Sequence, residues 1–173
     1  ENSDPSTVSL SSSNMETAIQ NASKLISLKS ITAKPDFDSK KDLSENDKAL
    51  LEQKEFNAWV DDSYFLIGKA RFYKHEFNEA ASVFSYCIAE ANDPEIKTES
   101  SIWLARTYGE RGSYIEANRL LNEIEINPKS PREIKAIYST TLADLFIKQK
   151  KYQEAIGPLS NSLKLISGKS AKY

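Results

Sequence analysis

The segment LARTYGERGSYIEA, residues 104–117, carries a pattern that occurs three times in this chain of 173 residues. The other copies are IGKARFYKHEFNEA at residues 67–80 and LADLFIKQKKYQEA at residues 142–155. In each copy a bulky apolar residue precedes Gly or Ala, an aromatic residue comes ten positions after the bulky one, and Ala closes the segment. The copies follow one another by 37 and then 38 residues, which indicates a fold built from one recurring unit.

This spacing is typical of two helices joined by a short turn. The second residue of each segment, Gly68, Ala105 or Ala143, has almost no side chain, so the first helix can approach its neighbour closely. We expect the closing alanines to be buried where helices cross. A single helical hairpin cannot bury its own apolar face, so the hairpins are predicted to stack into an all-α, α-α superhelical solenoid.

Further signals place the helices within each hairpin. Phe84, Leu121 and Leu159 occupy one register, four residues after the closing alanine, and are expected to pack. Asp93 followed by proline predicts a capped helix start near residue 94. Gly112 marks the turn inside the second hairpin.

The repeat register also divides the chain. Residues 1–13 are rich in serine and are predicted to be a flexible leader. The remaining predicted segments are N-terminal capping helices and a loop at 14–58, helical hairpins at 59–92, 93–129 and 130–168, and a tail or the start of a further repeat at 169–173. Ser44 is expected to cap a helix that runs from about residue 45 into the first hairpin without a break.

Composition argues against several function classes. The net charge of −2 and the pI of about 5.6 give no basic excess for binding nucleic acid. No Gly-rich phosphate-binding motif is present in the sequence, so we expect no nucleotide cofactor and no small-molecule substrate. No apolar run approaches the roughly 20 residues that a membrane span needs, so a membrane would be reached only through an anchor outside this segment.

The residues that most often carry chemistry have simpler interpretations here. The chain has one histidine, His75, expected in an exposed turn, and one cysteine, Cys87, expected in the core. These two residues are too few for a usual structural zinc site. The Asp61-Asp62 pair is interpreted as a solvated helix face, with a partner contact as the alternative. We therefore predict that the chain has no catalytic, cofactor or metal site and is not an enzyme.

The repeat residues resemble the tetratricopeptide-repeat (TPR) family across residues 60–167. The resemblance implies that the first helix of each repeat lines a concave groove, which would hold a protein partner as an extended peptide or a helix. An alternative is that a further part of the same protein covers this groove. The groove residues that the resemblance implies are Asp62, Phe65, Lys69, Phe72, Tyr73, Ile102, Arg106, Ile137 and Asp144.

A narrower likeness lies in WVDDSYFLIGKA at residues 59–70, in FYK at 72–74 and in IWLARTY at 102–108. These segments are similar to the TPR lipoproteins of bacterial gliding motility and type IX secretion. That likeness implies a periplasm-facing scaffold associated with the outer membrane, whose lipidated cysteine would lie upstream of Glu1. The alternative is a TPR interaction module of an unrelated cytosolic complex or regulator.

Overall fold

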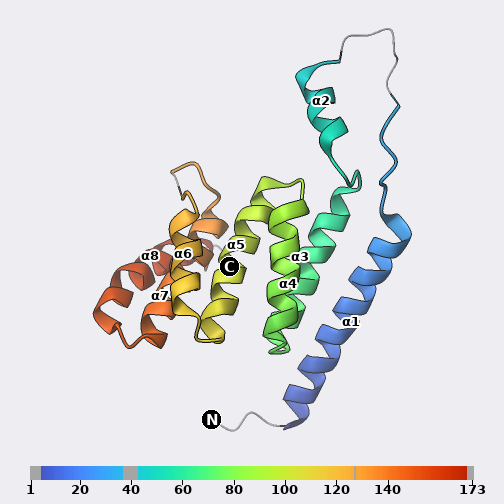
Figure 1. Ribbon diagram of the computed structural model, residues 1–173. Helices are drawn as coiled ribbons and strands as arrows, with labels where there is room; N and C mark the ends of the chain where they lie inside the picture. The colour runs from blue at the N-terminus through green and yellow to red at the C-terminus, as the bar shows by residue number, and fades with distance from the viewer. Residues whose placement is uncertain (1–4, 37–42, 127, 171–173) are drawn as a thin grey trace.

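The computed structural model describes residues 5–36, 43–126 and 128–170, of which 5–11 and 167–170 are described by their backbone alone. Within these residues every regular element is an α-helix, which confirms the all-α prediction (Figure 1). The helices are α1 (Pro5–Lys29), α2 (Glu45–Glu52), α3 (Ala58–Tyr73), α4 (Phe77–Glu90), α5 (Pro94–Glu110), α6 (Tyr114–Glu123), α7 (Arg132–Lys148) and α8 (Tyr152–Ser170).

The predicted hairpins are present as α3–α4, α5–α6 and α7–α8, and their turns are alike. Each turn holds one residue with a left-handed backbone: His75 (φ 60°), Gly112 (φ 77°) and Lys150 (φ 61°). Each also has a backbone N–H that donates back across the turn to a carbonyl near the end of the preceding helix, as from Ser113 to Tyr108 at 2.9 Å. The turns therefore recur with the same spacing as the sequence pattern.

The hairpins are arranged so that their first helices share a layer. The helices α3, α5 and α7 contact one another in that order, while each second helix contacts first helices (Figure 1). The closing alanines Ala80, Ala117 and Ala155 are at most 2% exposed, which confirms their predicted burial. This arrangement has the character of a helical repeat.

Two apolar clusters hold the layer together, and α5 contributes to both. One cluster joins α3, α4 and α5 around Phe84 and Trp103, whose rings stack with centroids 6.0 Å apart. The other joins α5, α6 and α7 around Leu121 and Leu145. Asp93 caps α5 by accepting a hydrogen bond from the backbone N–H of Glu95 at 2.7 Å, as predicted.

The flexible leader predicted for residues 1–13 is wrong for residues 5–13, which form the first turns of α1; residues 1–4 lie outside the described part. Proline is tolerated in the first helical turn, and neither Gly nor Pro follows Pro5 before Lys29, so nothing in the sequence stops the helix from extending back from the apolar stretch. Ile19 and Ala22 of α1 pack against α3, in the predicted capping position.

The unbroken helix predicted from residue 45 is also wrong. Residues 53–57 separate α2 from α3, and Figure 1 shows α2 projecting away from the row of other helices. The Glu55 carboxylate accepts hydrogen bonds from the backbone N–H groups of Ile31 (2.7 Å) and Asn57 (2.9 Å). Asn57 then caps α3 by accepting from the N–H of Trp59 at 3.1 Å. These contacts fix a non-helical backbone between the two helices.

Candidate protein-interaction surface

The layer of α3, α5 and α7 carries the predicted groove residues, but three of them are not on its surface. Phe65 is 8% exposed and Phe72 is 6% exposed, because both pack into the cluster between α3, α4 and α5. Ile102 is fully buried in the cluster of α5, α6 and α7. The prediction that these three side chains line an open groove is therefore wrong. They are buried between the helices, beneath the surface that the groove would occupy.

The two predicted cations lie over buried aromatic rings. The Lys69 Nζ is 4.8 Å from the centroid of the Phe65 ring. The Arg106 guanidinium carbon is 5.3 Å from the Phe72 centroid and 5.1 Å from the Trp103 centroid. Cation–π contacts of this kind hold a positive charge at an apolar surface without needing a carboxylate partner. Both cations are partly buried, and the Arg106 Nε has no hydrogen-bond partner in the structure.

Carboxylates flank the cations on α5. Glu99 is half-buried, and burial raises the pKa of its carboxyl, while the charge of Lys69 acts in the opposite direction. Three further acidic groups, Asp93, Glu95 and Glu133, also raise the pKa of Glu99. The surface therefore combines two cations with an acidic side chain that is more readily protonated than an ordinary glutamate.

At the α7 end of the layer the charges are paired within the chain. Lys148 lies 2.7 Å from the Asp144 carboxylate on its own helix and 3.2 Å from Glu110 on α5. Burial lowers the pKa of Lys148, but its hydrogen bonds with Asp144 and Glu110 outweigh this and raise it. Asp144, one of the predicted groove residues, is thus paired with Lys148 of its own helix, and Lys148 joins α7 to α5.

The remaining predicted residues differ in accessibility. Tyr73 is 53% exposed, and its ring meets those of Phe72 and Trp103 edge-on at 5.7 and 5.8 Å. Ile137 is half-buried against both apolar clusters. Of the predicted apolar groove residues, Tyr73 and Ile137 are therefore the two that this surface can offer to a partner, beside Lys69 and Arg106.

The Asp61-Asp62 pair does not form a solvated face. Asp61 is 7% exposed, and its carboxylate accepts hydrogen bonds from the backbone N–H groups of Asn92 (2.7 Å) and Asp93 (3.4 Å). Asp62 is exposed and lines a cavity of about 270 Å³ where the loops before α3 and before α5 meet. Asp61 therefore has a structural role, and Asp62 lies at the edge of the α3–α5–α7 surface.

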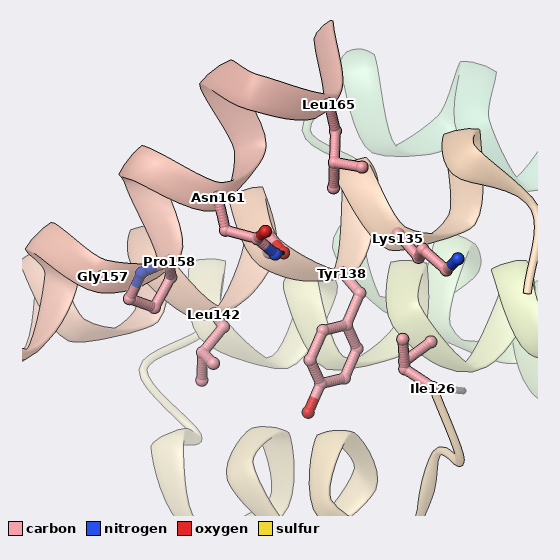
Figure 2. Close-up of a pocket in the computed structure, with 9 residues that line it drawn as sticks. Ile126, Lys135, Tyr138, Leu142, Gly157, Pro158, Asn161 and Leu165 are labelled. Carbon is pink, nitrogen blue, oxygen red and sulfur yellow. Dashed lines mark hydrogen bonds between the residues drawn. The ribbon is translucent and has the colours of Figure 1, made fainter. Parts of the chain in front are cut away.

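A second apolar feature lies on α8, which the predicted groove did not include. A cavity of about 380 Å³ opens between α7 and α8, and Figure 2 shows side chains from both helices, among them Tyr138 and Leu165, around it. Its polar side chains Ser139 and Asn161 hydrogen-bond each other at 2.7 Å. Leu159, predicted to pack like Phe84, is 41% exposed. The sequence signal for an apolar side of α8 is the recurrence of large apolar residues every three or four positions from Tyr152 to Ile166.

Cys87 and His75, the cysteine and the histidine of the chain, lie in different environments. Cys87 is 1% exposed, and burial raises the pKa of its thiol to about 11. His75 is exposed in the α3–α4 turn, with its ring edge-on to Phe77 at 5.5 Å. Among the described residues, no group of three His, Cys, Asp or Glu side chains is placed to hold a metal ion. None of the helices in that part of the chain is long and apolar enough to cross a membrane.

Comparison of the chain with protein-family models, with curated proteins and with solved structures found no match. The conclusions about function therefore depend on the residues and the geometry described above, together with the sequence resemblance.

Proposed function

We propose that this chain is a TPR-like scaffold that binds a protein partner through the α3–α5–α7 surface. The observation that carries the proposal is the placement of Lys69 and Arg106. They occupy equivalent positions one repeat apart, and each lies over an aromatic ring. Two cations presented in this way, beside the exposed ring of Tyr73, suit an acidic segment with an apolar side chain, in extended or helical form.

Buried and exposed side chains have different roles at this surface. Phe65 and Phe72 hold the cations in place, so substituting them tests stability more than binding. Exposed Tyr73 supplies apolar contact, while the cations contribute charge complementarity that acts strongly on association rate and specificity. A binding role also fits the deep burial of Cys87, which keeps the thiol from acting as a nucleophile.

Site-specific photocrosslinking tests this proposal. A photoreactive phenylalanine analogue at Tyr73 is expected to capture a partner in native cells, whereas the same group at Ile115, on α6 and 82% exposed, is not. Lys69→Gln and Arg106→Gln should each weaken the capture at Tyr73 by tenfold or more, about 1.4 kcal/mol. This loss of capture should be larger at low salt, where charge interactions are less screened. Circular dichroism verifies folding. Equal capture by the folded Gln variants would refute the proposed surface.

We further propose that the scaffold faces the periplasm as part of a secretion or gliding-motility machine, with a cytosolic complex as the alternative. The support is the likeness of residues 59–74 and 102–108 to the TPR lipoproteins of those systems. Fractionation of native cells, with detection of the chain by antibody, separates the two placements. Recovery with the outer membrane supports the first placement, and recovery with cytosolic proteins supports the alternative.

A further inference from the structure

Two rows of equivalent residues cross the α3–α5–α7 surface, one helical turn apart. The repeat spacing of 37 and 38 residues places Lys69, Arg106 and Asp144 in one row and Tyr73, Glu110 and Lys148 in the other. The two rows are four residues apart on each helix, so α5 and α7 each carry a cation and a carboxylate on one side. The order of the charges is reversed between these helices: the cation comes first on α5, and the carboxylate comes first on α7.

The four charges on α5 and α7 have two ways to pair. The contact between Glu110 and Lys148, at 3.2 Å, shows that equivalent positions on the two helices lie side by side. By the same register Arg106 is the neighbour of Asp144. Arg106 is also four residues from Glu110 on its own helix. In one arrangement Arg106 and Lys148 would share the two carboxylates, and in the other Lys148 holds both.

The structure has the second arrangement. The Lys148 Nζ lies 2.7 Å from each Asp144 carboxylate oxygen and 3.2 Å from Oε1 of Glu110. Within the described residues, the Arg106 guanidinium has neither a hydrogen bond nor an ion pair, and its buried Nε has no acceptor. It lies instead on the rings of Phe72 and Trp103. A cation without a carboxylate therefore lies beside one that holds two.

Two local features explain why Lys148 takes both carboxylates. A carboxylate four residues before a cation is the favourable order along a helix, and α7 has this order whereas α5 has the reverse. The Arg106 guanidinium is also held by two aromatic rings, an attraction that needs no carboxylate. The indole Nε1 of Trp103, a residue that is 5% exposed, likewise has no acceptor among the described residues. This part of the surface thus has hydrogen-bond donors without acceptors.

We propose that Lys148 is a positioning residue for partner binding: by holding the Glu110 and Asp144 carboxylates, it keeps the Arg106 guanidinium free to receive a carboxylate of the partner. This inference rests on the proposed function, because it concerns the same surface. A guanidinium binds a carboxylate through paired N–H donors, which would be occupied if Arg106 paired within the chain. Lys148 acts through the two carboxylates, because its ammonium has three N–H groups and three carboxylate oxygens lie around it.

Phenylglyoxal labelling of arginine side chains tests this inference without a partner. Mass spectrometry gives the labelling rate of Arg106 relative to that of Arg119, which is exposed on α6. Lys148→Met, with Lys148→Gln as a second variant, should slow the labelling of Arg106 by at least about twofold, because the released carboxylates then pair with it. Lys148→Arg keeps a cation between the carboxylates and should restore the wild-type rate.

A matched control removes a cation from α5 without releasing a carboxylate. The Arg111 guanidinium lies 5.9 Å from the Tyr108 ring and pairs with no carboxylate among the described residues, so Arg111→Gln should not slow the labelling of Arg106. The triple variant Lys148→Met/Glu110→Gln/Asp144→Asn removes the released carboxylates and should label Arg106 at the wild-type rate. Circular dichroism verifies that each variant is folded.

Capture by the photoreactive group at Tyr73 connects these rates to binding. Lys148→Met should weaken the capture by at least about twofold, and the triple variant should recover it. The inference alone is overturned if the wild type captures a partner and folded Lys148→Met leaves either the labelling of Arg106 or the capture unchanged. If the wild type captures nothing at Tyr73, the proposed surface is refuted, and the inference is refuted with it.

Discussion

The hairpins α3–α4 and α7–α8 share a sequence pattern and a turn geometry, but different contacts hold them together. In α3–α4 the helices meet through aromatic rings, such as Phe65 and Phe84 with centroids 6.1 Å apart. In α7–α8 the contacts include polar groups, such as the Thr140 and Ser162 hydroxyls at 2.7 Å, beside apolar side chains such as Leu142 and Leu165. The repeat pattern therefore specifies the shape of a hairpin. The residues between the pattern positions specify which contacts hold its two helices together.

The two hairpins also differ in what covers them. The first lies between α1 and α5, whereas in the described part of the chain the last contacts neighbours through α7. Apolar residues at equivalent positions are thus buried on α4 and exposed on α8. We infer that the first hairpin contributes more to the stability of the fold than the last one does, and that α8 is the less stable of the two second helices.

The largest expected effect tests this unequal distribution directly. Phe84→Ala removes a fully buried ring and should lower the free energy of unfolding by about 3–5 kcal/mol. Leu159→Ala, in the same register on α8, should lower it by about 1 kcal/mol or less, because that side chain is already 41% exposed. Urea denaturation followed by circular dichroism measures both. Equal losses would show that Leu159 is covered in solution.

Much of this fold was predictable from local sequence, because its units are local. The closing alanines, the Asp93 cap and the Gly112 turn each depend on neighbours within a few residues, and the structure confirms all of them. The break between α2 and α3 was not predictable, because it depends on Glu55 binding a backbone group of Ile31, 24 residues away. Long-range contacts of this kind leave no periodic signal in the sequence.

The candidate surface was predictable only in part, for a related reason. The positions of Lys69 and Arg106 followed from the repeat, and the structure places both over aromatic rings in the same way. Helical spacing alone does not show how far a neighbouring helix covers a side chain, so Phe65 and Phe72 were assigned to a groove that they only underlie. The exposure of Leu159 on α8 was missed because the equivalent residues Phe84 and Leu121 are buried.

Glycine substitution sharpens the comparison, with unequal effects expected in the two hairpins. A Cβ added at Gly68 would lie 2.6 Å from Cε1 of the buried Phe84 ring, so Gly68→Ala should destabilise the fold by about 1–3 kcal/mol. A Cβ at Gly157 on α8 meets nothing within 4 Å beyond its chain neighbours, but Pro158 disfavours a helical alanine directly before it. This clash opposes the gain in helix propensity, so Gly157→Ala should change the stability by less than about 1 kcal/mol. Thermal unfolding monitored by circular dichroism measures both variants. Equal losses would mean that α8 packs more closely than described.

A thiol placed at equivalent positions in the two hairpins compares how readily each opens. Cys87 on α4 is buried, with its pKa raised to about 11 by burial, so alkylation at neutral pH should be slow until the protein unfolds. Ser162 occupies the same register on α8. In Cys87→Ser/Ser162→Cys the thiol should react at least about tenfold faster, because α8 opens at a lower free energy. Iodoacetamide labelling followed by mass spectrometry gives the rates, and a slower reaction at 162 would reverse our ranking of the hairpins.

The smallest expected effect concerns α1, which covers the first hairpin through α3. The Lys74 Nζ at the end of α3 lies 2.6 Å from the Glu16 carboxylate on α1 and 2.7 Å from Glu76. Hydrogen bonds from Lys74 hold the pKa of Glu16 and that of Glu76 below the ordinary value of 4.5. Hydrogen bonds to the same two carboxylates raise the pKa of Lys74 above 10.5.

The direction of these shifts fixes the pH window. Because the folded carboxyls have the lower pKa, their stabilisation is present above about pH 4.5 and is lost as the pH falls through their folded pKa. Because the folded Lys74 has the higher pKa, its contribution is present below about pH 10.5 and is lost above it. Glu16→Gln should therefore lower the melting temperature slightly at about pH 7, and by progressively less as the pH falls below about 4.5 through the folded pKa of Glu16. Glu45→Gln, which breaks an exposed pair with Lys48 on α2, is the matched control and should leave the melting temperature unchanged across this range. A Glu16→Gln effect that persists in acid would mean that the side chain holds α1 by packing, and that the charge cluster does not fasten the cover of the first hairpin.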